Sequence, residues 1–253
     1  MSESVHTQLQ KQFKILLVGD DCNDVYRFGT VDRISPEAPV PVFKSLYDIH
    51  KPGMAANVRL NLEALGCTVV SMLGEPSKKI RFIDTRSKQH IIRLDNDVIS
   101  KPLKMDDIKH TLFDAIVISD YNKGFVSYEL ITDLRNAYSC PIFVDTKKTD
   151  LARLEGCFIK INQHEFSLLT SKPKTGLIVT HGDNGVVWDE WCFGAKTVEV
   201  ADVCGAGDTF LSALTYEYLN TQNMHKAIDF AVDASAVTVQ HLGNYAPTLK
   251  EIK

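Results

Sequence analysis

The chain has 253 residues, of which 44% are hydrophobic and 24% charged, and its formal net charge is −4. This composition is typical of globular proteins, and the length suits one α/β domain with a small appendage. The lack of a basic excess argues against nucleic-acid binding by bulk electrostatics, and no run of 18 apolar residues would span a membrane.

The N-terminal sequence and the cysteines indicate the cellular compartment of the protein. The N-terminus, MSESVHTQLQKQFK, is polar and lacks the apolar segment of a signal peptide. The six cysteines include no CxxC pair and lie mostly beside apolar residues, which favours reduced thiols over a disulfide framework or a zinc site. We therefore expect a cytoplasmic protein that binds neither nucleic acid nor membranes.

Short apolar segments alternate with amphipathic ones along the chain. The segments with the length and boundaries of strands are 15–18, 68–73, 115–119, 142–144, 158–161 and 177–180. The segments with helical spacing are 55–65, 128–137, 164–170, 208–219 and 224–241. This alternation predicts an α/β fold with a mostly parallel sheet and helices on both of its faces.

Two segments depart from the alternation. Residues 31–46 contain three prolines and short β-prone stretches, and residues 79–95 form an expected β-hairpin around a polar TRSKQ turn. We expect both to form a small β lid over one end of the sheet. Residues 1–253 are then one domain, with lid segments at about 31–46 and 79–95.

The motif with the most chemical content is DVCGAGDTF at 202–210, which follows the β-prone stretch 197–200 and precedes an amphipathic helix. The glycines allow close approach of the backbone to a ligand and leave N–H groups free at the helix start, where the dipole favours anions. Asp208 beside such a site can accept a hydroxyl proton during phosphoryl transfer. The alternative for an isolated GxGD is a simple helix N-cap.

This motif resembles the second signature of the ribokinase-like (PfkB) carbohydrate kinases. The resemblance implies a three-layer sandwich of the ribokinase type and an ATP-dependent kinase. Asp208 is then the catalytic base, and the N–H groups of Gly205, Ala206 and Gly207 hold the γ-phosphate.

Further motifs extend the resemblance. Asn162 and Glu165 follow a strand and match the family's NxxE element, which supports Mg²⁺ through water, although the same pattern alone would be a capping box. The turn formed by Thr180, Gly182 and Gly185 matches the family's TxGxxG turn beside the nucleotide, and it also fits a β-hairpin turn. The resemblance further assigns Asp145 to the metal site and Asp233 to the nucleotide, where the family often has Asn.

The acceptor side of the site is assigned in the same way. Asp24 best matches the family's sugar-binding aspartate, although Asp20 stays an alternative. Gly53 and Asn57 match the first PfkB signature. In that signature Pro52 replaces a glycine, which removes a backbone N–H donor.

One branch of the family is more similar than the others. The string RISPEAPVPV at 33–42 and the segments IRLD at 92–95 and SDY at 119–121 resemble D-glycero-β-D-manno-heptose 7-phosphate kinase. The implied reaction produces the 1,7-bisphosphate from ATP and the phosphorylated sugar. A phosphorylated acceptor requires basic groups. Basic residues of the predicted lid segments include Arg33, Lys79, Arg81, Arg86 and Arg93. Of these, Arg33, Arg81 and Arg93 are the predicted acceptor-binding residues.

The resemblance also has gaps and leaves alternatives open. After Gly74 the family usually has a further helix and strand, whereas here the chain passes almost at once to Lys78. Another sugar or a nucleoside is therefore a possible acceptor, and a catalytically weak nucleotide-binding protein of this fold is a further alternative. The family also suggests a homodimer through the lid, a Mg²⁺ requirement and a role for a monovalent cation such as K⁺.

Overall fold

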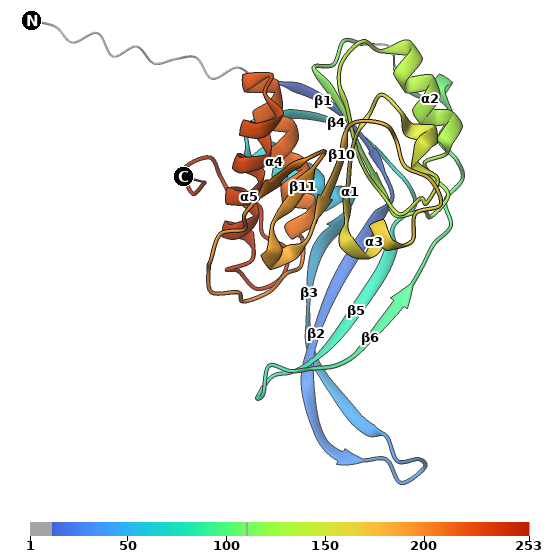
Figure 1. The fold of residues 1–253 in the computed structure, drawn as a ribbon. Coiled ribbons are helices and arrows are strands. Elements are labelled where there is room, and N and C mark those ends of the chain that lie inside the picture. Colours follow the sequence, from blue (N-terminus) through green and yellow to red (C-terminus); the bar gives the residue numbers. More distant parts are fainter. Residues whose placement is uncertain (1–11, 110, 253) are drawn as a thin grey trace, which may run out of the picture.

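The computed structural model describes residues 12–109 and 111–252, and the N-terminal segment discussed above lies largely outside them. The chain forms a body built on one large sheet and a long, separate sheet that projects from it (Figure 1). The predicted α/β class with a mostly parallel central sheet and a β lid is confirmed.

The central sheet has eight strands in the order β12-β11-β10-β9-β8-β7-β1-β4. Its strands are β1 (Lys14–Gly19), β4 (Thr68–Leu73), β7 (Ala115–Asp120), β8 (Ile142–Thr146), β9 (Phe158–Asn162), β10 (Leu177–Thr180), β11 (Val186–Trp188) and β12 (Trp191–Phe193). The pairs from β4 to β10 are parallel, and the last two pairs are antiparallel. The buried strands are nearly continuous apolar runs because helices cover both faces.

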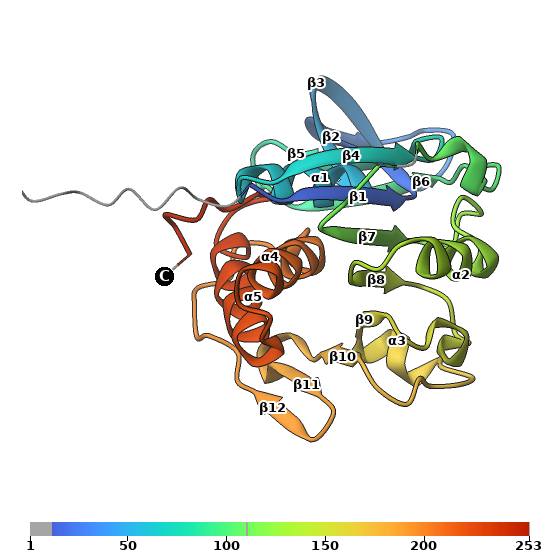
Figure 2. The same ribbon diagram turned by 90° about the horizontal axis from the view of Figure 1, so that it is seen from above.

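Helices cover both faces of this sheet, and the longest of them lie on one face (Figure 2). The helices on one face are α1 (Ala55–Ala64), α4 (Ala206–Thr221) and α5 (Met224–Thr238). Those on the other face are α2 (Tyr128–Ala137) and the short α3 (Gln163–Ser167). Alternate residues of β1 serve the two cores, with Leu17 facing α4 and Leu16 facing α2.

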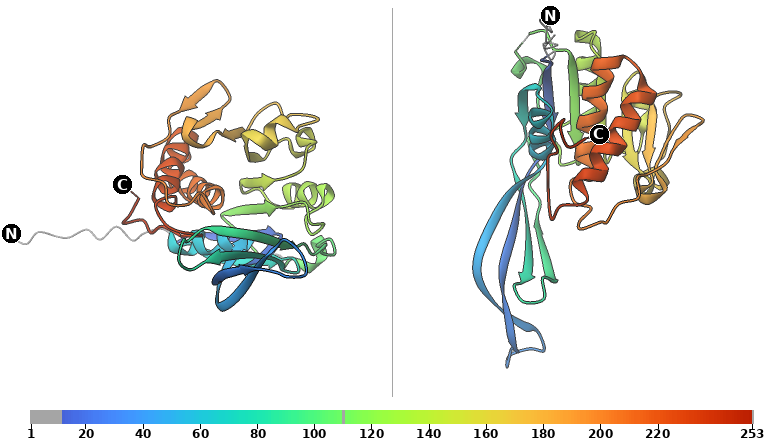
Figure 3. Two further views of the ribbon diagram at one scale, coloured as in Figure 1. Left: turned by 90° about the horizontal axis from the view of Figure 1, so that it is seen from below. Right: turned by 90° about the vertical axis from the view of Figure 1, so that its left-hand side faces the viewer.

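The lid is a four-stranded sheet in the order β3-β2-β5-β6. Its strands are β2 (Asp21–Ile34), β3 (Pro41–Met54), β5 (Ser77–Asp84) and β6 (His90–Asn96). They extend well away from the body as a curved ribbon (Figure 3). The lid therefore spans more residues than the predicted 31–46 and 79–95, because β2 and β3 continue to the base of the body despite the Asp and Gly residues along β2.

Very short joints connect the lid to the body. Asp20 alone separates β1 from β2, and β3 ends at Met54, whose φ of 50° places it in the left-handed region just before α1. Residues 74–76 alone connect β4, the edge strand of the central sheet, to β5. The short passage after Gly74 noted in the sequence is therefore a direct connection into the lid.

Two local predictions differ from the structure. The helix expected at 164–170 is only Gln163–Ser167, because Leu168 already closes it as C-cap. The β-prone stretch 197–200 forms no strand and runs as an irregular segment along the wall of a cavity described below. Within the described residues, no helix is both long and apolar enough to cross a membrane.

Packing of α4 on the sheet should dominate the stability of the body. Leu214 is fully buried in the core beneath α4, so Leu214→Ala should lower the free energy of unfolding by about 2–5 kcal/mol. The matched control is Leu112→Ala, whose side chain is 91% exposed and should change stability by less than about 0.5 kcal/mol. Urea unfolding followed by circular dichroism would measure both, and equal effects would contradict this account of the core.

Candidate active site

The start of α4 presents unpaired backbone N–H groups. Gly205 is the N-cap and has a φ of 78°, which favours glycine, and a Cβ there would lie 2.9 Å from Asn57 Nδ2. Ala206 N donates a long bond of 3.3 Å to Val203 O. Within the described part of the chain, the N–H groups of Gly205 and Gly207 donate no hydrogen bond. These groups and the helix dipole make this point suited to an anion.

Asp208 lies one residue further along, in the first turn of α4, and its side chain is buried. Asn57 Nδ2 from α1 donates to its Oδ2 at 2.8 Å, and the hydroxyl of Tyr121 donates to its Oδ1 over 3.4 Å. Burial raises the pKa of Asp208 to about 6, opposed by the bond from Asn57. A carboxyl group with this pKa is a base of useful strength near neutral pH.

A chain of polar contacts fixes α4 against α1 and α5 around this carboxylate. Asn61 Nδ2 donates to Asn57 O at 2.9 Å, and Thr209 Oγ1 donates to Asn61 Oδ1 at 2.8 Å. Thr238 Oγ1 of α5 in turn donates to Thr209 Oγ1 at 3.0 Å. All of these groups are buried, so their mutual hydrogen bonds are needed to offset desolvation, and they hold Asn57 in place.

A buried lysine lies against residues 205–207 at the start of α4, which are called the anion-binding turn below. Lys160, on β9, has its Nζ 2.8 Å from Asp145 Oδ2, and a Cβ added to Gly207 would lie 2.8 Å from the same Nζ. Gly207 therefore leaves the room that this ammonium group occupies. This ion pair places the Asp145 carboxylate beside the turn, where it is bound to the ammonium group of Lys160.

Asn162 and Glu165 form the capping box of α3. This was one of the two interpretations of their motif in the sequence. Asn162 N donates to Glu165 Oε2 at 2.8 Å, and Glu165 N donates to Asn162 Oδ1 at 2.9 Å. The other oxygen of Glu165 forms an ion pair with Lys147. The capping box leaves the nearly buried carboxylate of Glu165 at the end of β9.

The donor set at the strand ends suits Mg²⁺ only in part. Glu165 and Asp145 supply carboxylate oxygens, which this ion prefers, and Mg²⁺ retains several waters when bound. The described residues nevertheless form no group of three or more His, Cys, Asp or Glu side chains able to hold a metal ion. These residues therefore fit an ion that is held mainly through water and ligand phosphates.

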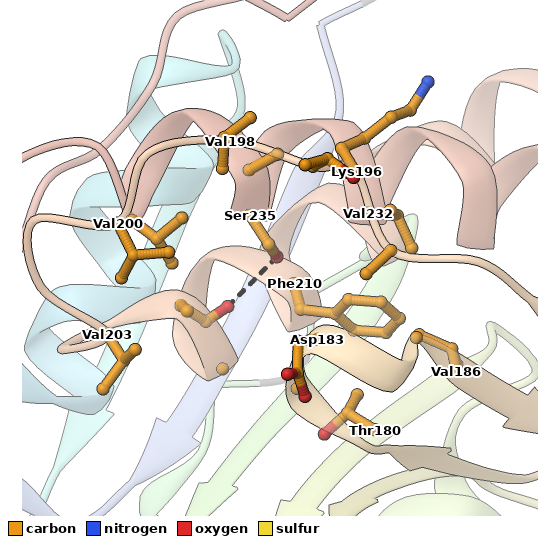
Figure 4. Close-up of a pocket in the computed structure, with 18 residues that line it drawn as sticks. Thr180, Asp183, Val186, Lys196, Val198, Val200, Val203, Phe210, Val232 and Ser235 are labelled. Atoms are coloured by element: carbon orange, nitrogen blue, oxygen red, sulfur yellow. Dashed lines mark hydrogen bonds between the residues drawn. The ribbon is translucent and has the colours of Figure 1, made fainter.

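A cavity of about 660 Å³ opens next to the anion-binding turn and is bounded by Ala206 and Gly207. Figure 4 shows Phe210, Val186 and Val232 around its apolar interior. Most of the wall is apolar, with few polar groups, as is common in small-molecule sites.

Some of the residues predicted to bind the nucleotide line this cavity, and others do not. Thr180, Gly182 and Gly185 line it, and Gly185 has a φ of 89° that favours glycine. Asp233 contacts it indirectly, through an ion pair of 3.0 Å with Lys196, which lines the wall. Asn162 lies outside the lining residues, at the end of β9.

On the lid side, two of the predicted acceptor-binding residues, Asp24 and Arg81, form an ion pair with each other. Their ion pair measures 2.5 Å and both side chains are about nine-tenths buried. A Cβ on Gly53 would lie 2.3 Å from Asp24 Oδ2, so Gly53 makes room for this carboxylate. Asn244 Nδ2 bonds to Pro52 O at 2.7 Å and approaches Asp24 Oδ2 at 3.4 Å.

The other acceptor-side candidates separate into two groups. Asn57 lies at the centre of the site, bonded to Asp208. Arg93, on β6, is paired with Asp95 at 2.9 Å and is exposed, and Arg33 is exposed near the far end of β2. The alternative Asp20 is buried under the site, where its Oδ2 accepts from Tyr121 N at 2.7 Å and from Lys123 N at 3.2 Å.

Sequence reasoning gave no role to Lys160, Tyr121 or Asn244. Lys160 had a usable signal, since it is a charged residue inside the apolar strand Phe158–Asn162 and buried lysines are rare unless paired. Tyr121 was noted only as part of a matching segment. Asn244 follows Gly243 in a loop and has no distinguishing pattern in the sequence.

Comparison with known proteins identifies the family. A family profile described as "pfkB family carbohydrate kinase" matches residues 117–251, which include most of β7, the α3 capping box and the anion-binding turn. The chain belongs to this family. The pfkB assignment agrees with the resemblance found in the sequence.

Relatives and solved structures extend the match over nearly the whole chain. The bifunctional protein HldE of Nitratiruptor sp. is 32% identical over 299 aligned positions, covering 95% of this chain and 64% of its own length. The chain thus spans about two thirds of that relative. Phosphofructokinase-2 of Escherichia coli superposes with a TM-score of 0.70 at 16% identity, covering 95% of this chain and 97% of its own. Ribokinase of Thermotoga maritima gives 0.65 at 17% identity, with coverages of 95% and 98%. These structures establish the fold.

The raised pKa of Asp208 predicts a measurable effect of pH on stability. Because the folded-state pKa of about 6 exceeds the ordinary value, the native state binds the proton more tightly than the unfolded chain. The stability of the wild type should therefore fall as the pH rises from about 4 to about 6 and then level off.

Asp208→Asn removes this titration. Its free energy of unfolding, relative to wild type, should increase by up to about 3 kcal/mol between pH 4 and pH 7. Urea unfolding of both proteins across this range measures the difference. A difference that is constant with pH would show that the carboxylate is not destabilised by burial.

Proposed function

We propose that this pfkB-family carbohydrate kinase uses ATP to phosphorylate the anomeric O1 of D-glycero-D-manno-heptose 7-phosphate, giving the 1,7-bisphosphate. The observation that carries the kinase chemistry is the arrangement of Asp208, a buried carboxylate with a pKa of about 6, beside free N–H groups at the start of α4. The identity of the acceptor rests on the sequence segments described above.

In the proposed reaction, the Asp208 carboxylate accepts the proton of the acceptor hydroxyl as the hydroxyl oxygen attacks the γ-phosphorus of ATP. The bond between that phosphorus and the bridging oxygen breaks, and ADP leaves. The N–H groups of Gly205 to Gly207 stabilise the charge on the transferred group. Lys160, next to Gly207, adds a positive charge at the same point.

ATP is assigned to the cavity of about 660 Å³, with Thr180, Gly182, Gly185 and, through Lys196, Asp233 on the nucleotide side. Its phosphates then extend toward Ala206 and Gly207, which bound the same cavity. Asn162, Glu165 and Asp145 are proposed to support Mg²⁺ through water, and this ion would neutralise phosphate charge. A monovalent cation such as K⁺ is included in the proposal on family grounds.

The acceptor is assigned to the space between Asp208 and the base of the lid. Asn57, Gly53 and Asp24 border this space, and Asp24 retains an oxygen, Oδ2, that is not part of its ion pair with Arg81. Arg33, Arg81 and Arg93 stay proposed acceptor-side residues. A different sugar or a nucleoside is the second candidate acceptor, because the chain passes from β4 to β5 through residues 74–76 alone and so lacks a segment usual in the family.

The test compares wild type with Asp208→Asn in an ATP-consumption assay using heptose 7-phosphate, fructose 6-phosphate and ribose. The variant should lose at least about 10²-fold in kcat, because a positioned base typically contributes 10² to 10⁴. Binding of ATP, measured by calorimetry, should stay within a few-fold of wild type, since Asp208 does not line the cavity. Heptose 7-phosphate should give the highest kcat/KM.

Two results would contradict the proposal in different ways. Equal turnover by wild type and Asp208→Asn would remove Asp208 from the mechanism. A higher kcat/KM with ribose or fructose 6-phosphate would leave the kinase chemistry intact and replace the acceptor. Asn57→Asp provides a further control, because it keeps the size of the side chain but removes the donor to Asp208 and should raise the pKa of the base.

We also propose that the lid forms a homodimer. Its strands expose large apolar side chains, including Leu46 at 57% and Ile92 at 60%, and open sheet edges readily pair with another chain. Leu46→Glu should shift the protein from dimer to monomer in size-exclusion chromatography with light scattering. Leu112→Glu, at an exposed site on the body, is the matched control. A wild type that is monomeric at micromolar concentration would exclude this dimer.

A further inference from the structure

The basic side chains of the lid differ in whether a carboxylate already neutralises them. Arg81 is paired with Asp24, and Arg93 with Asp95. Arg86 contacts both Asp32 and Asp84 near the lid's far end. These guanidinium groups are therefore committed to partners within the lid. Lys79 is different.

Lys79 lies on β5 between two acidic neighbours that are both engaged elsewhere. In the sheet it is directly opposite Asp24 on one side and Asp95 on the other. Asp24 binds Arg81, and Asp95 binds Arg93. Among the described residues, no carboxylate lies within 4.0 Å of the Lys79 ammonium group, which instead lies 5.4 Å from the centre of the Tyr121 ring.

Tyr121 connects this ammonium group to the catalytic carboxylate. Its backbone N–H is fixed by Asp20 Oδ2 at 2.7 Å, and its hydroxyl donates to Asp208 Oδ1. Lys79 consequently lies about one tyrosine side chain away from the base. An acceptor whose reacting hydroxyl is at Asp208 would extend from there toward the lid and Lys79.

A second lysine, which is paired with Glu165, contacts the same ring and brings another ammonium group close to Lys79. Lys147 Nζ lies 5.2 Å from the centre of the Tyr121 ring. Burial lowers the pKa of Lys147, and the neighbouring Lys160 and Lys79 lower it further, although Asp145 acts in the opposite direction. Cations held this close repel each other, and an anion bound between the lid and the body would relieve that repulsion.

We propose that Lys79 binds the phosphate group that the acceptor already carries, so that the enzyme selects sugar monophosphates over unphosphorylated sugars. This inference rests on the proposed function and deepens it. It assigns acceptor selection to a lid lysine that has no carboxylate partner among the described residues and lies against the ring of Tyr121. The ring of Tyr121 holds the ammonium group at the inner face of the lid, ready for a ligand.

The experiment is steady-state kinetics of wild type and Lys79→Gln with heptose 7-phosphate and with the unphosphorylated heptose. For Lys79→Gln, KM for heptose 7-phosphate should rise about 10- to 100-fold, as expected for the loss of a charged hydrogen bond. KM for ATP, and kcat/KM for the unphosphorylated sugar, should stay within about threefold of wild type. The preference for the phosphorylated sugar should therefore collapse.

Matched variants separate this role from a structural one. Lys78→Gln removes the neighbouring charge on the same strand, where the side chain is exposed, and should leave every constant within about twofold of wild type. Lys79→Arg, which keeps the positive charge, should recover most of the preference. Thermal unfolding of each variant checks that the lid remains folded.

Each remaining outcome has a definite meaning. If Lys79→Gln lowers kcat equally for both sugars, Lys79 acts on the transferred phosphoryl group and the inference is wrong. Unchanged kinetics for Lys79→Gln would also overturn it. If wild type phosphorylates no sugar phosphate at all, the proposed function itself fails, and that result is visible before any variant is compared.

Discussion

The site depends on keeping a carboxylate ionised in a place where water is largely excluded. Burial raises the pKa of Asp208, and the donor from Asn57 opposes this rise, so that the pKa is about 6. Asn57 belongs to α1, which is about 150 residues earlier in the chain than α4. The hydrogen bonds through Asn61, Thr209 and Thr238 therefore hold the donor to Asp208 in place as well as joining the helices.

Around that carboxylate, two lysines are paired with carboxylates of the protein. Lys160 is bound by Asp145, and Lys147 by Glu165. Such pairs keep charged groups in a buried site at a tolerable free-energy cost. The proposed function assigns Asp145 and Glu165 to the support of a metal ion, and the two lysines hold these carboxylates in place.

Local motifs made the fold and the anion-binding turn predictable, because glycines at a helix start and apolar strands carry their signal within a few residues. The contacts of Lys160, Asn244 and the Asp24–Arg81 pair were not predictable in this way. They depend on which strands become neighbours and on their register, as in the pairing of Tyr26 with Arg81 across β2 and β5. The irregular path of 197–200 also shows that β propensity yields when no partner strand is available.

The direct passage from β1 into β2, and from β3 into α1, constrains how the lid can move. Neither connection contains a flexible loop, and Asp20 is itself anchored to the backbone of Tyr121 and Lys123. These two connections offer no hinge, so a change in lid angle would have to bend the long strands themselves. Bending of their outer halves would leave the root of the lid, and the residues anchored there, in place.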